Sequence, residues 1–310
     1  MRLCVWNLIL LSLVGGVSTT TIANDRFEVE VSRDIEFAKV DDVSLKLDLY
    51  RPVGTEAPPV GTEAPPLVVW VHGGAWRAGS KDSMPLESLV KRGYAIASVD
   101  YRLSPVAKFP AQVHDCKAAI RFLRAKAKQY GYDASKIGIA GSSAGGHLVA
   151  EIGVTNGHPK LEGTIGEHLA QSSAVQAIVD YYGPTNFLTI LKQSTPHGLS
   201  VRVPALQLLL GSQPDENVAL AKLASPVFHV DRNDPPLLMI HGDYDPQVPI
   251  NQSHELHGRY KELGLSARLE VIYGGAHGGR EFYDQARIDL VDQFLTKHLR
   301  RANAGGQTSN

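Results

Sequence analysis

KIGIAGSSAGG, at residues 136–146, is the stretch that decides the fold. Its first five residues are mostly apolar, which is typical of a short buried strand, and GSSAG at 141–145 follows directly as a G-x-S-x-G sequence. Small residues on both sides of Ser143 allow the chain to turn tightly from a strand into a helix while the serine hydroxyl stays clear of the sheet. The stretch therefore predicts a strand–turn–helix unit with Ser143 as a candidate nucleophile. A serine-rich turn that only caps a helix is the alternative.

Further short apolar runs have the character of buried parallel strands. They span residues 67–71, 94–99, 175–181, 236–240 and 269–273. Ahead of them, leucines at 45–49 alternate with polar residues, which predicts a half-buried antiparallel segment at the edge of the sheet. Together with the helical patterns between the runs, this order predicts a mostly parallel, doubly wound α/β sheet.

Helical periodicity falls between the apolar runs. One face carries Val113, Cys116, Ile120 and Leu123 at spacings of three and four residues. A similar face lies near the C-terminus, over residues 291–299. Because Cys116 is on the apolar side of its helix, we expect a buried structural thiol rather than a reactive one.

The two ends of the chain differ in character from residues 24–301, which we predict to be a single domain. Residues 1–23 combine a positive start, a short apolar stretch and small residues before a cut after Ala23, which predicts a signal peptide and a secreted or periplasmic protein. An uncleaved anchor is the alternative, but the apolar stretch is short for a membrane span, so no stable membrane anchor is expected after cleavage. Residues 302–310 are polar and glycine-rich, which predicts a disordered tail.

The composition limits the possible partners. The chain has 310 residues, with 31 Lys and Arg against 32 Asp and Glu and a net charge of −1. A nucleic-acid binder would carry a basic patch, so nucleic acid is not an expected partner. No cluster of His, Asp or Cys has ligand spacing, so neither a metal site nor a cofactor is expected. The oligomeric state is not predicted.

A tandem repeat interrupts the chain ahead of the first apolar run. The sequence VGTEAPP occurs at 53–59 and again at 60–66. Its glycine and proline content predicts a loop, and a duplicated loop is tolerated at little cost in stability. Because the functional end of the strand over 67–71 is its carboxyl end, we expect the repeat to lie on the face away from the site.

A second motif, HGGAW at 72–76, follows the apolar run over 67–71. Acyl transfer builds negative charge on a carbonyl oxygen, and backbone N–H groups that a glycine-rich loop exposes can stabilise that charge. Gly74 and Ala75 are the candidate donors here, and the N–H of Ala144 would complete the oxyanion hole.

A carboxylate that orients a catalytic histidine is expected at the end of a strand. HGDYDPQVP at 241–249 offers two candidates. Asp245 is favoured because it precedes Pro246 in a turn that leads away from the strand, whereas Asp243 suits a turn or capping role.

The candidate general base is His277, within GGAHGG at 274–279. A histidine in a glycine-rich loop after the last strand can reach over the serine. The order Ser143, Asp245, His277 is the order of nucleophile, acid and base in α/β folds that carry a G-x-S-x-G turn. Other histidines are expected to be structural or superficial, and these are His72, His254, His257 and His298.

The residues that would form a substrate pocket are less sharply marked. Trp76 is expected to pack the HGGAW loop and to form a pocket wall, and Tyr182 is a second candidate for the pocket. The segments 157–173 and 186–229 interrupt the strand pattern and are candidates for a small cap. Within the second, residues 204–211 are apolar enough to line an acyl pocket.

With these motifs in place, the chain resembles an α/β-hydrolase esterase over almost the whole mature sequence. Within that superfamily it is similar to the BD-FAE-like and hormone-sensitive-lipase-like carboxylesterases. The residues that carry the resemblance are HGGAW at 72–76, VDYRLSP at 99–105, FPAQVHDCKAAIRFL at 109–123, GSSAGGH at 141–147, HGDYDPQVP at 241–249 and GGAHGG at 274–279. The resemblance implies the α/β-hydrolase fold with a small cap. It departs from the lipase-like HGGG sequence at Ala75, which still has an N–H to donate.

The resemblance also implies roles for residues near the serine. Asp100 and Arg102 would be structural, and Asp115 would pair or cap nearby. An anion site at Arg102 and Asp115 is the alternative. His147, one helical turn after Ser143, would pack beneath the catalytic residues.

The activity that the resemblance implies is that of a serine carboxylic ester hydrolase that acts through an acyl-enzyme. Expected substrates are small or aromatic-acid esters, including feruloyl or acetyl esters of plant polysaccharides. An arylformamidase-type amide hydrolase is the alternative, because HGG-x-W also occurs in such enzymes. A non-catalytic binding module on the same fold is disfavoured, because Ser143, Asp245 and His277 are all present.

Overall fold

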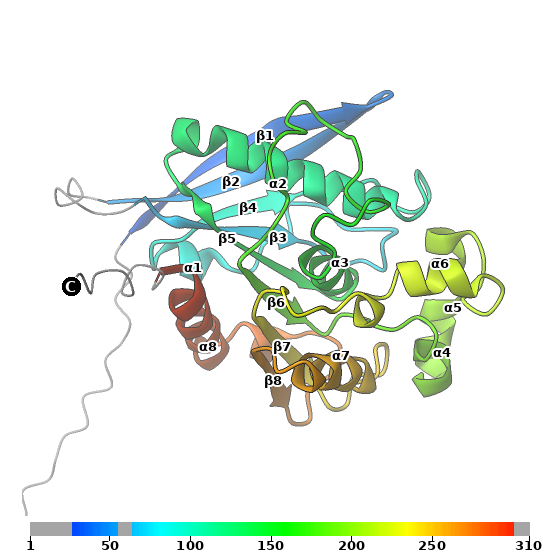
Figure 1. The fold of residues 1–310 in the computed structure, drawn as a ribbon. Coiled ribbons are helices and arrows are strands. Elements are labelled where there is room, and N and C mark those ends of the chain that lie inside the picture. The colour runs from blue at the N-terminus through cyan, green and yellow to red at the C-terminus, as the bar shows by residue number, and fades with distance from the viewer. Residues whose placement is uncertain (1–26, 55–63, 301–310) are drawn as a thin grey trace, which may run out of the picture.

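The computed structural model describes residues 27–54 and 64–300, which build one eight-stranded sheet with helices on both faces (Figure 1). The strand order is β1-β2-β4-β3-β5-β6-β7-β8. The strands are β1 Glu28–Val40, β2 Val43–Val53, β3 Pro66–Val71, β4 Ala95–Val99, β5 Asp133–Ser142, β6 Ala177–Tyr181, β7 Leu237–Gly242 and β8 Ala267–Ile272. Strands β3 to β8 pair in parallel, while β1 and β2 run antiparallel at one edge. The predicted mostly parallel sheet with an antiparallel edge is confirmed.

Strand β1 has no counterpart in the sequence prediction. It lies at the edge of the sheet, and within it only Phe37 and Ala38 are buried. Register shifts interrupt its pairing with β2 after Ser32 and after Glu36. Apolar and polar residues alternate at 27–31 and again at 35–37, so a signal for this strand was available, although the register shifts interrupt its period.

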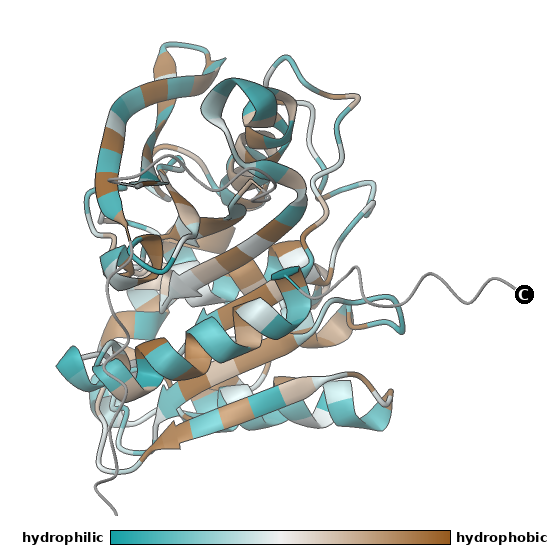
Figure 2. Ribbon diagram, turned by 90° about the vertical axis from the view of Figure 1, so that its left-hand side faces the viewer, coloured by the Kyte–Doolittle hydropathy of each residue, from teal (hydrophilic) through white to brown (hydrophobic). Residues whose placement is uncertain are grey.

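The helices cover both faces of the sheet, and Figure 2 shows the hydrophobic strands between them. The longer elements are α2 Ala111–Tyr130, α3 Ala144–Gly153, α5 Pro196–Leu210, α7 Asn251–Glu262 and α8 Gln285–Leu295, and the shorter ones are α1 Glu87–Val90, α4 Ile190–Gln193 and α6 Val218–Leu223. Two cores result, one beneath α2, α3 and α7 and the other beneath α1 and α8. In β3, Leu67, Val69 and Val71 belong to the first core, and Val68 and Trp70 to the second.

The predicted helix faces are found on α2 and on the C-terminal helix. Val113, Cys116, Ile120 and Leu123 of α2 are fully buried. Burial raises the pKa of the Cys116 thiol well above its ordinary value, and the nearby Asp115 carboxylate raises it further. This keeps the thiol protonated and unreactive.

Of the two segments expected to form a cap, only 186–229 does so. Its helices α4, α5 and α6 gather at the far side of the molecule from α1 and α8 (Figure 1). The side chain of Thr195, before α5, donates a hydrogen bond of 2.8 Å to the carbonyl of Pro246, in the loop after β7. The cap therefore contacts the loop at the carboxyl end of β7.

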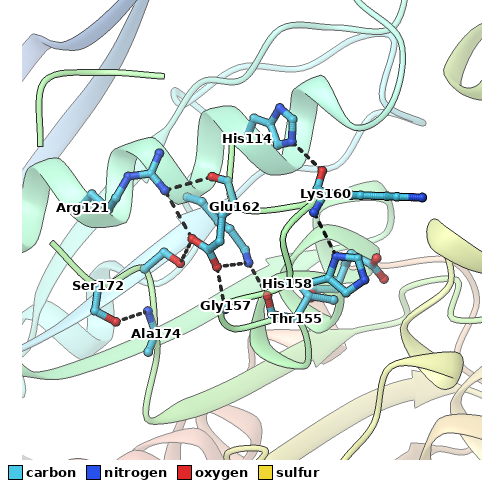
Figure 3. A network of polar contacts seen from close by, with 12 residues as sticks. His114, Arg121, Thr155, Gly157, His158, Lys160, Glu162, Ser172 and Ala174 are labelled. Carbon is cyan, nitrogen blue, oxygen red and sulfur yellow. Dashed lines mark hydrogen bonds and ion pairs between the residues drawn. The ribbon is translucent and has the colours of Figure 1, made fainter. Parts of the chain in front are cut away.

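The segment 157–173, by contrast, is held against α2 (Figure 3). Glu162 accepts a hydrogen bond of 2.7 Å from Nζ of Lys117, and its backbone carbonyl accepts one of 3.0 Å from Arg121. His114 contacts the carbonyl of Lys160 at 3.0 Å. These contacts tie the segment to the side of the sheet, so its expected role in a cap is wrong.

Several predictions lie outside the described residues. They concern the signal peptide over 1–23, the tail over 302–310 and most of the tandem repeat. Pro66, the last residue of that repeat, begins β3 at the opposite end of the strand from the HGGAW loop. Across the described parts of the chain, no helix is both long enough and apolar enough to cross a membrane.

Candidate active site

Ser143 stands at the sharp turn between β5 and α3. Its φ of 55° and ψ of −116° are unusual for a residue with a side chain, and its N–H donates a hydrogen bond of 2.8 Å to the carbonyl of Tyr181. The glycines of the motif make the turn possible. A Cβ added at Gly145 would lie 2.0 Å from the carbonyl oxygen of Val71, so only glycine allows α3 to approach β3 this closely.

The structure brings together the three residues predicted as nucleophile, base and acid. Oγ of Ser143 lies 2.8 Å from Nε2 of His277, and Nδ1 of His277 lies 2.6 Å from Oδ2 of Asp245. An ionised carboxylate can only accept a hydrogen bond, so Nδ1 carries the hydrogen and Nε2 is left to accept from the serine hydroxyl. This arrangement can withdraw the serine proton as the oxygen attacks an electrophile.

Asp245 is buried but has several hydrogen-bond donors around it. Its Oδ1 accepts hydrogen bonds of 2.8 Å from the N–H groups of Gln247 and Val248. Burial by itself raises the pKa of Asp245, but hydrogen bonds from His241 and His277 outweigh this and hold the pKa well below its ordinary value. The carboxylate is thus ionised and fixed in place.

Asp243, the other candidate acid, has a different role. Its Oδ1 accepts a hydrogen bond of 2.6 Å from the N–H of Gly274. It therefore joins the loop after β7 to the loop after β8, which is the turn role expected for it. His277, which lies three residues beyond Gly274, is placed in part through this contact.

Sequence reasoning missed His241, the penultimate residue of β7. Its Nε2 lies 2.9 Å from the carbonyl of Val248 and 3.3 Å from Oδ2 of Asp245, and its Nδ1 lies 2.7 Å from Oγ of Ser253. Because a carbonyl can only accept, Nε2 carries the hydrogen and Ser253 donates to Nδ1. His241 is therefore a second imidazole donor to the acid. The available signal was its position at the strand end, four residues before Asp245.

The HGGAW loop runs beside the nucleophile. A Cβ added at Gly73 would lie 3.3 Å from Cβ of Ser143. Gly74 has a φ of 111° and Ala75 a φ of 52°, so the loop takes left-handed turns there. Within the described chain, the N–H groups of Gly74 and Ala75 have no acceptor, and the N–H of Ala144 is in the first turn of α3, where no helical acceptor exists. These three donors are available to a ligand oxygen.

Trp76 and Tyr182 support the site rather than open a pocket. Trp76 is 0% exposed and donates its indole N–H to Nδ1 of His147 at 3.1 Å, so its predicted role as a pocket wall is wrong because it has no free surface. Tyr182 is 7% exposed, and its ring packs edge-on against the His277 ring at 4.9 Å between centroids. Each aromatic ring thus fixes a loop of the site.

The apolar segment 204–211 was also expected to line a pocket. Ala205, Leu206 and Leu209 are fully buried and belong to the core beneath the cap. Leu208, in α5, is exposed. The apolar pattern of this segment thus mainly reflects side chains that pack into the core.

Arg102 and Asp115 bind each other. Nε and Nη2 of Arg102 lie 2.9 and 2.7 Å from the Asp115 carboxylate, which also accepts the Arg102 backbone N–H at 2.9 Å. Asp100 accepts the N–H of Lys81 at 2.8 Å. These contacts fit the structural roles that the resemblance implied, and they engage Arg102 with an internal carboxylate rather than leaving it to an anionic ligand.

The remaining histidines near the serine are neutral structural groups. His72 stacks on Tyr101 with 4.4 Å between ring centroids, and burial lowers its pKa. Burial also lowers the pKa of His147 to about 4, and its Nε2 lies 2.9 Å from the carbonyl of Ala224. His254 and His257 are on α7. Among the residues that the structure describes, no group of three or more His, Cys, Asp or Glu is placed to hold a metal ion.

Residues 47–260 match the model of the BD-FAE family. The chain belongs to the BD-FAE family. The match covers β2 through α7, and thus includes the serine turn, the HGGAW loop and the acid of the site.

Individual relatives agree with this assignment. The chain is 31% identical over 240 residues to the esterase LipC of Mycobacterium tuberculosis, a match that covers 76% of this chain and 58% of LipC. It thus spans little more than half of the length of that relative. A truncated carbohydrate esterase from gut microbiota is 33% identical, with a TM-score of 0.76 and coverage of 90% of this chain and 99% of that one.

A third relative is a solved structure of Thermogutta terrifontis esterase 2 phosphonylated by sarin. It is 29% identical, has a TM-score of 0.71 and covers 87% of this chain and 94% of that one. The fold is therefore the α/β-hydrolase fold, as predicted, and these relatives are named as esterases.

Proposed function

We propose that the chain is a serine carboxylic ester hydrolase that acts through an acyl-enzyme. The observation that carries the proposal is the hydrogen-bonded series Ser143–His277–Asp245, beside three backbone N–H groups that have no acceptor among the described residues. The esterase names of the relatives support it.

In the proposed reaction, Oγ of Ser143 attacks the ester carbonyl carbon while Nε2 of His277 takes the serine proton. The N–H groups of Gly74, Ala75 and Ala144 form the oxyanion hole that stabilises the negative oxygen. The imidazolium then gives its proton to the leaving alkoxide, and the alcohol departs. Water, deprotonated by His277, attacks the acyl-enzyme and releases the acid with Ser143 restored. Asp245 holds the tautomer and stabilises the imidazolium.

The proposed substrates are small or aromatic-acid esters, including acetyl or feruloyl esters of plant polysaccharides. The likeness to a carbohydrate esterase supports a sugar-linked ester. The cap is built from three helices of 4, 15 and 6 residues rather than from a long lid, which suits a short acyl group.

A panel of esters tests the proposal. It comprises aryl acetate, butyrate and octanoate, methyl ferulate, an acetylated xylo-oligosaccharide and an N-formyl anilide. We expect hydrolysis of the short esters, with kcat/KM lower by about 10⁴-fold or more in Ser143→Ala. Ser142→Ala is the matched control, because it removes the neighbouring hydroxyl, and should retain activity. Undiminished turnover in Ser143→Ala, or hydrolysis of the formyl anilide alone, would contradict the proposal.

We also propose that residues 1–23 are a signal peptide and that the mature chain is secreted or periplasmic. The support is the charge and hydropathy pattern of the N-terminal sequence. N-terminal sequencing of the exported protein is expected to begin at Asn24. A chain that keeps Met1 and stays with the cells would contradict it.

A further inference from the structure

Arg202 is a buried cation in the middle of α5. Its side chain is 1% exposed, and Nε and Nη1 are buried with no hydrogen-bond acceptor. No carboxylate of the described chain forms an ion pair with it. A guanidinium that is taken from water without an acceptor is strongly unfavourable, so its position calls for a physical explanation.

The face of α5 that carries Arg202 lies on the loop of the catalytic acid. Gly198 is one helical turn before Arg202 and therefore on the same face. A Cβ added at Gly198 would lie 2.9 Å from the carbonyl oxygen of Pro246, the residue after Asp245. This face of the cap is thus directed at the active-site end of the sheet.

The guanidinium also contacts the oxyanion loop. Cζ of Arg202 lies 5.7 Å from the centroid of the Trp76 ring. Trp76 follows Ala75 directly, and its indole is hydrogen-bonded to His147, one turn after Ser143. Arg202 therefore lies where the cap meets both the HGGAW loop and the loop of the acid.

Asp245 makes no direct ion pair with Arg202, although its carboxylate is near enough for its charge to favour the protonated guanidinium. Its carboxylate already accepts hydrogen bonds from His277 and from two backbone N–H groups, and it makes no ion pair with Arg202. Arg77, an exposed residue of the same oxyanion loop, adds a second positive charge nearby. Burial lowers the pKa of Arg202 to about 10, which still leaves it protonated at neutral pH. Within the described chain, the junction of cap and loops thus holds a guanidinium whose Nε and Nη1 have no hydrogen-bond acceptor.

We infer that Arg202 is the anion-binding group of a subsite beside the catalytic serine, and that the preferred ester carries a carboxylate. The inference rests on the proposed esterase function and names its substrate class. A carboxylate can accept two parallel hydrogen bonds from one edge of the planar guanidinium, and so supplies an acceptor to a group that the protein leaves without one. The carboxylate belongs either to the acyl group or to the alcohol part of the ester.

Two matched pairs of esters distinguish these sources. In the acyl pair, monophenyl terephthalate is compared with phenyl 4-carbamoylbenzoate, its uncharged analogue. In the alcohol pair, 4-carboxyphenyl acetate is compared with 4-carbamoylphenyl acetate. We expect a preference for the carboxylate of about ten-fold or more in kcat/KM in one pair, expressed mainly in KM, because binding is what the charge improves.

The variant Arg202→Met is expected to abolish this preference while kcat for the uncharged analogues stays within about three-fold of wild type. Arg202→Lys keeps the charge without the fork and should restore part of the preference. Lys222→Met is the matched control, because Lys222 is an exposed cap cation that lies over Phe228 rather than Trp76. It should leave the preference unchanged. Equal hydrolysis of both members in both pairs, or an equal loss for charged and uncharged esters in Arg202→Met, would overturn the inference.

A binding measurement separates this inference from the proposed function. In Ser143→Ala, calorimetry with the two carboxylate esters should detect binding of the preferred one, and that binding should be lost in Ser143→Ala/Arg202→Met. Binding that depends on Arg202 without any turnover by wild type would refute the esterase proposal and keep the subsite. Turnover of uncharged esters together with carboxylate binding that ignores Arg202 would refute the subsite alone.

Discussion

Two buried charges lie at the candidate site, and their hydrogen-bond surroundings differ. Asp245, at the strand ends, accepts hydrogen bonds from His277 and from two backbone N–H groups, with His241 also beside it. Nε and Nη1 of Arg202, in the cap, have no hydrogen-bond partner among the residues that the structure describes. The strand ends thus hold chemistry that is organised before a substrate arrives, whereas the cap holds a group that a ligand would complete.

The largest expected effect comes from breaking the organised side. Asp245→Asn should lower kcat/KM for an aryl acetate by about 10⁴-fold, because the amide no longer holds the hydrogen on Nδ1 of His277. Asp243→Asn is the matched control, since Asp243 bonds Gly274 rather than His277, and should retain most activity. An equal loss of kcat/KM in the two variants would mean that the substitutions disturb the loops, and would contradict a specific role of Asp245 as the acid.

The second effect concerns the rigidity of the serine turn. Gly145→Ala places a Cβ 2.0 Å from a backbone oxygen of β3, and should reduce the free energy of unfolding by about 3 kcal/mol or more. Gly258→Ala, in α7, meets nothing within 4 Å and should raise it by about 0.5–1 kcal/mol. Denaturant unfolding measures both. A Gly145→Ala protein as stable as wild type would contradict the close approach of α3 to β3.

The third effect concerns His147, which connects the HGGAW loop to the end of α6 in the cap. His147 accepts from Trp76 and bonds the carbonyl of Ala224 beyond α6, and its pKa of about 4 is below the ordinary 6.5. Folding favours the neutral ring, so this stabilisation is complete above pH 6.5 and is lost as the pH falls toward 4, by roughly 3 kcal/mol in total. The melting temperature should therefore fall less steeply between pH 6.5 and pH 4 in His147→Gln than in wild type. An unchanged slope would place the acid sensitivity elsewhere.

The smallest effect is on the stability of the cap. Arg202→Met leaves no partner unsatisfied and removes a buried charge, so its melting temperature should equal or exceed that of wild type. Thermal unfolding without ligand measures this. A fall of several degrees would mean that Arg202 stabilises the fold, and the contrast with Asp245 would disappear.

The same contrast explains what the sequence could predict. The strand ends were predictable because Ser143, Asp245 and His277 each lie in a short motif directly after a strand, and parallel strands bring such loops to one edge. The choice between Asp243 and Asp245 followed from turn chemistry alone. His241 was within reach, because it shares the motif of the acid.

The cap was not predictable in this way. Nothing local marks Arg202 as unpartnered, because its surroundings come from Trp76 and from the loop of Asp245, both distant in the chain. The apolar run at 204–211 predicts a buried surface. It does not predict whether other protein side chains or a substrate cover that surface. The position of segment 157–173 was not predictable for a similar reason. Glu162 joins it to α2 through Lys117, which is distant in the sequence.

Covalent labelling tests the central claim, that Ser143 is the activated nucleophile, most directly. A fluorophosphonate should react with its phosphorus bonded to Oγ of Ser143 and fluoride released, as the first half of the proposed reaction would have it. Intact-protein mass and peptide mapping should find one adduct per chain, on Ser143, and none in Ser143→Ala. An adduct on another residue, or an unmodified wild-type protein, would contradict the account.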